Sequence, residues 1–239
     1  MQTQLSYFED SYKFMDQARI LVSDRDEIGP YLILNKTIFY PQGGGQPSDQ
    51  GICDGEGINV PIRLVKMKGS EVRHYTDQDY SQMVGKEVQC RIDQNLRILH
   101  AKLHTGGHLL SNVLESLYPH WKAAKGHHFP GQSYVEFISK EGRYAQIDAD
   151  LLQAKLQEII KKGLALEVSQ VPSDQLKEVC PDLPYTIQSE GPIRLIRIGD
   201  FPFSPCSGTH LKSLKELEGI TITKSKIKDR VLKVNYDVK

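Results

Sequence analysis

Two short motifs, about a hundred residues apart, constrain this chain more than any other feature. His104-Thr-Gly-Gly-His108 and Cys206-Ser-Gly-Thr-His210 each place two metal-competent side chains four residues apart. Together they supply three imidazoles and one thiol, the donor set that favours zinc over magnesium or calcium. If all four coordinate one ion, the site joins two remote segments of the chain into a single fold.

The alternative is a packed or solvated helix face that happens to carry histidines. The chain has 8 histidines, and His100 forms a second such pair with His104, so one HxxxH is unsurprising. Gly106 and Gly107 favour a functional site over an ordinary helix face, because each glycine inside a helix costs about 1 kcal/mol of stability relative to alanine. Two adjacent glycines therefore predict that some group approaches the helix backbone closely.

The first motif lies in a predicted helix over about Asn95–Leu117. Leucine and valine recur there at spacings of three, four and seven, as an amphipathic helix requires. Asp93 is the predicted N-cap and Pro119 ends the run. Thr105 occupies the position at which HExxH metalloproteases carry glutamate, which excludes a protease of that kind.

Composition places the chain among soluble proteins of one or two domains. It has 239 residues, 39% hydrophobic and 25% charged, with no apolar run long enough to cross a membrane. The first ten residues lack the basic and apolar segments of a signal peptide, so we expect a cytoplasmic location. Cys53, Cys90 and Cys180 are widely spaced, and we interpret them as small buried residues or surface thiols. Oligomeric state is not predicted.

The formal net charge is zero but unevenly distributed. Residues 1–90 carry 9 basic and 13 acidic side chains, and residues 91–239 carry 21 and 17. The basic side chains near the C-terminus are candidate RNA contacts: Lys224, Lys226, Lys228 and Arg230. Lysines that protect a hairpin edge are the alternative.

Residues 1–90 have a β pattern and residues 91–239 a mixed one. Short predicted strands at Tyr31–Tyr40, Ile58–Met67, Glu71–Tyr75 and Glu87–Ile92 are separated by turn residues, which favours a small β-barrel. The second part predicts a further helix and four further strands: Asp148–Lys162, Leu166–Val171, Ile193–Ile198, Ile220–Thr223 and Val231–Tyr236. The fold class is therefore α+β, in two domains.

A glycine-rich loop between these strands is the second candidate site. Gly43, Gly44 and Gly45 lower the steric barrier to a ligand or to another backbone, and Gln46 offers both a donor and an acceptor. The loop matches neither a P-loop nor a GxGxxG turn. A flexible turn is the alternative.

Three segments together resemble the AlaX family, free-standing relatives of the alanyl-tRNA synthetase editing domain, and its medium-length class in particular. They are Phe39–Gly51, similar to FYPxGGGQPxDxG; Leu103–Leu110, similar to HTAxHLL; and Arg194–Asp200 followed by Cys206–Leu211, similar to the CGGTH segment. Gly106 stands where alanine is usual, and Ser207 replaces a glycine. The resemblance implies an N-terminal β-barrel, residues 1–90, and an α+β editing domain of the threonyl/alanyl type, residues 91–239.

The resemblance also implies a function and a set of site residues. The function is hydrolysis of mischarged tRNA(Ala) carrying serine or glycine. One zinc per chain would be held by His104, His108, Cys206 and His210. Gln46 and Thr105 would assist catalysis, and the glycine-rich loop would meet the substrate from the other domain. His127-His128-Phe129-Pro130 falls outside the motifs, as structural or substrate-flanking. The alternative function is an RNA-binding module without hydrolytic activity, in which zinc only stabilises the fold.

Overall fold

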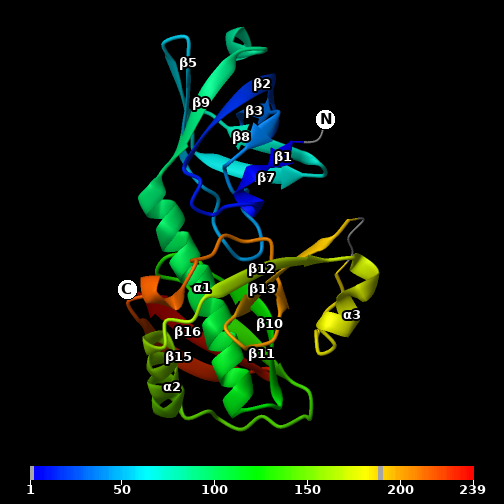
Figure 1. Cartoon of the computed structure of the whole chain (residues 1–239), viewed down its shortest axis with the longest axis vertical. Coiled ribbons are helices and arrows are strands. Elements are labelled where there is room, and N and C mark those ends of the chain that lie inside the picture. The colour runs from blue at the N-terminus through cyan, green and yellow to red at the C-terminus, as the bar shows by residue number, and fades with distance from the viewer. Residues whose placement is uncertain (1–2, 188–190) are drawn as a thin grey trace. The chain divides into compact units, whose positions relative to one another are not determined.

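The computed structural model describes residues 3–187 and 191–239. The chain divides into two compact units, Met1–Leu99 and His100–Lys239, each described here by itself. The division falls inside helix α1, Gln94–Leu117, so one helix belongs to both units (Figure 1). The boundary between an N-terminal domain, residues 1–90, and an editing domain, residues 91–239, stays a prediction. Among the described residues, no helix is both long and apolar enough to span a membrane.

The first unit is built on an antiparallel sheet in the order β6-β5-β9-β2-β3-β8-β7. The strands are β2 Met15–Arg25, β3 Pro30–Leu34, β5 Gly51–Gly55, β6 Ile58–Ile62, β7 Leu64–Lys68, β8 Glu71–Tyr75 and β9 Glu87–Ile92. Only Arg63 separates β6 from β7, so the chain itself joins the two ends of a curled sheet. No ladder joins β6 to β7 within the described residues, so the closed barrel stays a prediction.

Small elements complete this unit. Strands β1 Gln4–Leu5 and β4 Lys36–Thr37 form a parallel pair, and two 3-10 turns cover Ser6–Phe8 and Ser81–Met83. Strand β9 alternates exposed and buried residues along its length, as a strand with one face on a core does. Cys53 on β5 lies opposite Cys90 on β9 with 3.1 Å between their sulfurs, and both are buried. Cys180 is also buried, which confirms the buried interpretation of all three cysteines.

The predicted strand Tyr31–Tyr40 is wrong beyond Thr37, although the residues that follow are buried. Side chains take the backbone donors that a neighbouring strand would otherwise bind. The Phe39 N–H donates to Thr37 Oγ1 at 3.0 Å, and the Tyr40 N–H donates to Asp49 Oδ2 at 2.6 Å. The chain therefore enters the glycine-rich loop as an irregular but buried segment.

The second unit contains a four-stranded antiparallel sheet in the order β10-β11-β16-β15. Its strands are β10 Trp121–His127, β11 Tyr134–Ser139, β15 Ile220–Lys228 and β16 Val231–Val238. Helices α1 and α2, Ala149–Lys161, lie beside it (Figure 1). The predicted cap at Asp93 is confirmed, because its side chain accepts from the Leu96 N–H at 3.0 Å. Asp148 caps α2 in the same way, accepting from the N–H groups of Asp150 and Leu151.

A three-stranded antiparallel sheet leads to the second motif. It consists of β12 Leu166–Val171, β13 Ile193–Ile198 and β14 Ser204–Pro205, in that order. Short helical elements flank it: the 3-10 turns Ser173–Gln175 and Leu214–Glu216, and helix α3, Leu176–Val179. Because β14 ends one residue before Cys206, pairing of β14 with β13 fixes where the cysteine loop begins.

Candidate metal centre

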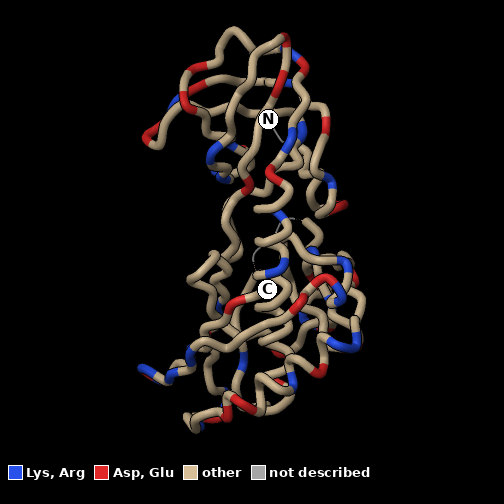
Figure 2. Tube along the Cα trace, turned by 90° about the vertical axis from the view of Figure 1, so that its left-hand side faces the viewer, with Lys and Arg blue, Asp and Glu red and all other residues tan. Residues whose placement is uncertain are grey.

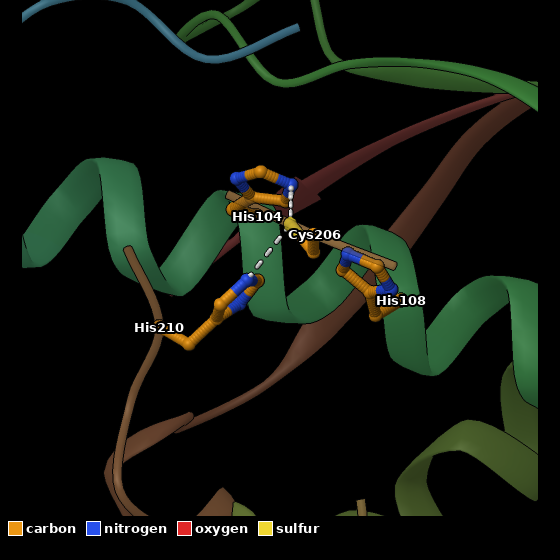
Figure 3. A group of neighbouring side chains, drawn as sticks. All are labelled: His104, His108, Cys206 and His210. Atoms are coloured by element: carbon orange, nitrogen blue, oxygen red, sulfur yellow. Dashed lines mark hydrogen bonds between the residues drawn. The ribbon is translucent and has the colours of Figure 1, made fainter. Parts of the chain in front are cut away.

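The two motifs meet inside the second unit. Helix α1 presents His104 and His108 one turn apart, and the loop after β14 presents Cys206 and His210 (Figure 3). One ligand atom from each residue lies within 4.8 Å of all the others. His104 and His210 are buried, whereas His108 and Cys206 are half-buried.

The donor atoms have the chemistry and spacing that a tetrahedral metal ion needs. Cys206 Sγ lies 3.3 Å from His104 Nε2 and 3.2 Å from His210 Nε2. Nitrogen at about 2.0–2.1 Å and sulfur at about 2.3 Å from a zinc ion would stand roughly 3.5–3.6 Å apart at tetrahedral angles. The two separations, 3.3 and 3.2 Å, are slightly shorter, so small side-chain shifts would let these residues hold a metal ion.

Burial keeps the donors in their neutral forms while no metal is bound. It lowers the pKa of His108 to about 4, and the charge of Arg194 acts in the same direction. It also lowers the pKa of His104 and His210 well below the usual range. Burial raises the pKa of the Cys206 thiol to about 11, against the opposing effect of Arg194. At neutral pH the imidazole lone pairs are free for a metal, whereas the thiol must lose its proton on binding.

Arg194 on β13 organises the cysteine loop. Its Nη1 donates to the backbone carbonyls of Cys206, at 2.8 Å, and Gly208, at 3.0 Å. The Gly208 N–H in turn donates to Cys206 Sγ at 3.3 Å. From the sequence alone, Arg194 was not assigned a role in the site. The signal that could have identified it is its position inside the apolar run Ile193–Ile198, because a buried strand accommodates an arginine only when the guanidinium has hydrogen-bond partners.

Thr105 contacts one of the four clustered residues. Its side chain is fully buried, its Oγ1 accepts from the Leu211 N–H at 3.1 Å, and it lies 3.4 Å from His210 Nδ1. A metal-ligating histidine commonly has its second ring nitrogen held in this way, which sets the tautomer and the orientation of the ring. Thr105 is therefore placed to orient the His210 ring.

The helix glycines have the close neighbours that the sequence predicts. A Cβ at Gly106 would lie 3.0 Å from Val238 Cγ1, and one at Gly107 would lie 2.4 Å from His128 Cε1 and 2.8 Å from Tyr236 Oη. The groups that approach the helix are therefore side chains of this chain, at and near the four-stranded sheet. Neither His128 nor Tyr236 was identified as a site residue from the sequence.

The glycine-rich loop belongs to the first unit, whereas the four clustered residues belong to the second. It is a tight turn in which the N–H of Gln46 donates to the Gly43 carbonyl at 2.8 Å and the reverse bond is 3.2 Å. Gly44 and Gly45 have φ values of 53° and 76°, a left-handed backbone that glycine adopts without strain. The Gln46 side chain is fully buried. Two of the three glycines thus have a conformational reason for being there.

The predicted basic residues lie on one hairpin of the second unit. Lys224, Lys226 and Lys228 are exposed on β15, and Arg230 lies in the turn that leads to β16. A groove of about 550 Å³ is lined by the three lysines with Thr223, Lys233 and Asn235. Along the whole trace, Lys and Arg are interspersed with Asp and Glu (Figure 2).

Comparison with known proteins gives the site a family context. Residues 5–96 match the family model described as tRNA synthetases class II (A). Residues 193–233, which include Cys206 and His210, match the threonyl and alanyl tRNA synthetase second additional domain. The alanyl-tRNA editing protein AlaX-M of Pyrococcus horikoshii is 32% identical over 217 residues, 90% of this chain and 88% of that protein. The chain belongs to the AlaX family. The resemblance read from the three motifs is confirmed.

Other relatives of this AlaX-family chain are longer. The alanyl-tRNA editing protein AlaX-L of Pyrococcus horikoshii is 28% identical over 88% of the chain, which spans 52% of that protein. An alanine–tRNA ligase of Caldivirga maquilingensis is 27% identical over 95% of the chain, which spans 26% of the ligase. The chain thus spans about half of one relative and about a quarter of the other.

Proposed function

We propose that this AlaX-family chain is a trans-editing hydrolase. It cleaves the ester that joins a wrong amino acid to the 3′-terminal ribose of tRNA(Ala), with serine as the main error and glycine as the second. The observation that carries the proposal is the cluster of His104, His108, Cys206 and His210, whose ligand atoms all lie within 4.8 Å of one another. Relatives at 26–32% identity bear the name alanyl-tRNA editing protein, which supports it.

The proposed cofactor is one zinc ion per chain, held by the four clustered side chains. Three nitrogens and one sulfur suit zinc better than a hard cation, and two separations near the tetrahedral range support the choice. When bound, zinc supplies a fixed positive charge and Lewis acidity toward an ester carbonyl.

The chain's own residues orient the site. Arg194 holds the loop that carries Cys206, and Thr105 holds the ring of His210. We place Thr105 among the residues needed for activity through this contact. Gln46 and the glycines Gly43, Gly44 and Gly45 are proposed substrate contacts, supported by the family motif that they share with the rest of the segment.

Editing explains why a second site is needed. A pocket for alanine cannot exclude smaller glycine, and it rejects serine poorly, because such differences are worth only about 1–3 kcal/mol. A hydrolytic site that hydrogen-bonds the serine hydroxyl can instead reject alanine strongly. Serine is therefore the better proposed substrate, since glycine also lacks the hydroxyl.

The basic hairpin is the proposed contact with tRNA phosphates. Lys226 on β15 pairs directly with Lys233 on β16, and like charges in that position destabilise a sheet. Lys233 has partners on β11, because its Nζ lies 3.8 Å from Glu136 Oε1 and 3.2 Å from the centre of the Tyr134 ring. Phosphate binding accounts for the exposed basic residues Lys224, Lys226, Lys228 and Arg230.

Deacylation kinetics test the proposal. Purified protein should release serine from Ser-tRNA(Ala) over many turnovers while sparing Ala-tRNA(Ala), with Gly-tRNA(Ala) and Ser-tRNA(Thr) as further substrates. Cys206→Ala should lose both the metal and the activity, whereas Cys53→Ser should keep both. Binding of tRNA without turnover would support the RNA-binding module instead, which the names of the relatives do not favour. Equal rates on alanine and serine would contradict editing.

A further inference from the structure

A further buried histidine, His128, lies against the four clustered residues without belonging to them. His128 follows strand β10, is 4% exposed, and stacks on His104 with 4.3 Å between ring centroids and 24° between planes. The four clustered ligand atoms come from other residues. His128 is thus positioned to act on a ligand.

Two glycines from different elements make the space that His128 occupies. A Cβ at Gly107 of α1 would lie 2.4 Å from the imidazole Cε1, and a Cβ at Gly126 of β10 would lie 2.5 Å from its Nε2. Real Cβ contacts essentially never fall below 3.0 Å. Glycine weakens both helix and strand interiors, so its presence on two sides of one ring indicates a space shaped for that ring.

Tyr236 of β16 fixes how the ring of His128 is turned. Its hydroxyl is buried and donates its single proton to the Leu103 carbonyl at 2.7 Å. His128 Nδ1 lies 2.6 Å from the same oxygen, so this nitrogen carries the hydrogen and donates it. The bonds run from His128 through Tyr236 to Leu103, the residue before His104. These hydrogen bonds therefore connect the His128 ring, which stacks on His104, to the turn of α1 that carries His104.

We propose that His128 is a positioning residue for the metal ligand His104. Its ring, held by Tyr236 and enclosed by Gly107 and Gly126, keeps the His104 imidazole in the orientation that turns Nε2 toward Cys206 Sγ, 3.3 Å away. Outer residues of this kind typically change metal affinity about 10–100-fold when removed. The inference rests on the proposed metal site, and it adds a ring contact to the support that Thr105 gives His210.

Cobalt binding tests the role without any measurement of activity. Metal-free protein is titrated with Co²⁺, and the dissociation constant and the visible ligand-field spectrum, which reports coordination geometry, are recorded. His128→Ala should weaken binding at least about tenfold and should shift the bands. Tyr236→Phe should shift them in the same direction by less. His127→Ala is the matched control, because the His127 ring stacks on Phe129 and Tyr134 instead.

A pair of adjacent glycine variants gives a second test that keeps His128 in place. Gly107→Ala puts a methyl group into the space of the imidazole, so it should weaken Co²⁺ binding even though alanine favours the helix. Gly106→Ala is the neighbouring control: its Cβ would meet carbons of Val238, Tyr236 and Ile220 at 3.0–3.5 Å and not the imidazole, so it should weaken Co²⁺ binding less than Gly107→Ala does.

The outcomes separate the two proposals. Failure of the unmodified chain to bind Co²⁺ would overturn the metal site and the positioning role together. Unchanged affinity and spectrum in His128→Ala, or equal losses in the His127→Ala control, would overturn the positioning role alone. If His128→Ala does not fold, the contrast between Gly107→Ala and Gly106→Ala decides the question.

Discussion

Asp49→Asn should destabilise the first unit more than any surface substitution. Asp49 and Arg97 form an ion pair in which both side chains are fully buried. Arg97 also donates to the carbonyls of Ser11, at 2.8 Å, and Ile38, at 2.6 Å, while Asp49 accepts from the Tyr40 N–H. The amide keeps the shape of the carboxylate but leaves the guanidinium charge buried without a counter-charge.

The size of the effect follows from that burial. Removing one partner of a fully buried pair costs about 3–5 kcal/mol. In a unit of this size each kcal/mol lowers the melting temperature by roughly 4–8 °C, so the transition of the first unit should fall by at least about 12 °C. The exposed pair Arg19–Glu87, with side chains 56% and 59% accessible, is the matched control. Glu87→Gln should cost less than about 1 kcal/mol.

Calorimetry and urea unfolding measure both variants, and a double-mutant cycle isolates the pair. Arg97→Met should be costly alone, because Asp49 is then the unpaired charge. Combined with Asp49→Asn, it should cost about 2 kcal/mol less than the two single losses together. A loss below about 1 kcal/mol for Asp49→Asn, or strictly additive losses, would refute the reasoning that an unpaired buried charge dominates.

Three further outcomes follow from the two units. His74 is fully buried and its pKa is lowered to about 4 by burial, so only the unfolded chain gains its proton between about pH 6.5 and 4. Stability should therefore be complete above pH 6.5 and fall by about 3 kcal/mol by pH 4, and His74→Gln should remove that part of the slope in urea unfolding. Thr105→Ala should retain the metal but lower deacylation about 10–100-fold, because the ring of His210 loses its support; an unchanged rate would contradict this role. Gly43→Ala should leave the melting temperature unchanged, since its Cβ meets nothing nearer than 3.8 Å, and should lower activity if the loop meets substrate. Gly44→Val should lose about 1–2 kcal/mol from its positive φ alone, and equal melting temperatures for the two variants would contradict that.

The spacing of apolar and capping residues in the sequence predicted those features that depend on neighbouring residues alone. Helix α1, its cap at Asp93 and the pairing of His104 with His108 follow from spacing within a single helix. The meeting of that pair with the cysteine loop was predicted from donor chemistry and motif resemblance, because spacing in the sequence says nothing about contacts a hundred residues apart. The adjacent glycines predicted a close approach to the helix, and that was right.

Contacts between remote segments were the part that the sequence did not reveal. Strand β10, Trp121–His127, was missed because its lysines, alanines and glycine have low strand propensity, and pairing with β11 determines its conformation. Arg194 and His128 were missed as site residues for a related reason. Their roles depend on backbone carbonyls and on a tyrosine supplied by other elements, which no periodicity displays.

The order of strands in the second sheet has a consequence for how the protein is made. Strand β16 lies between β11 and β15, so β11 gains its second neighbour only after residue 238 has left the ribosome. Until then β11 is an unpaired edge, a template for pairing with other nascent chains. A chain broken off between residues 211 and 230 would still contain His104, His108, Cys206 and His210, but it would lack Tyr236 and would expose that edge.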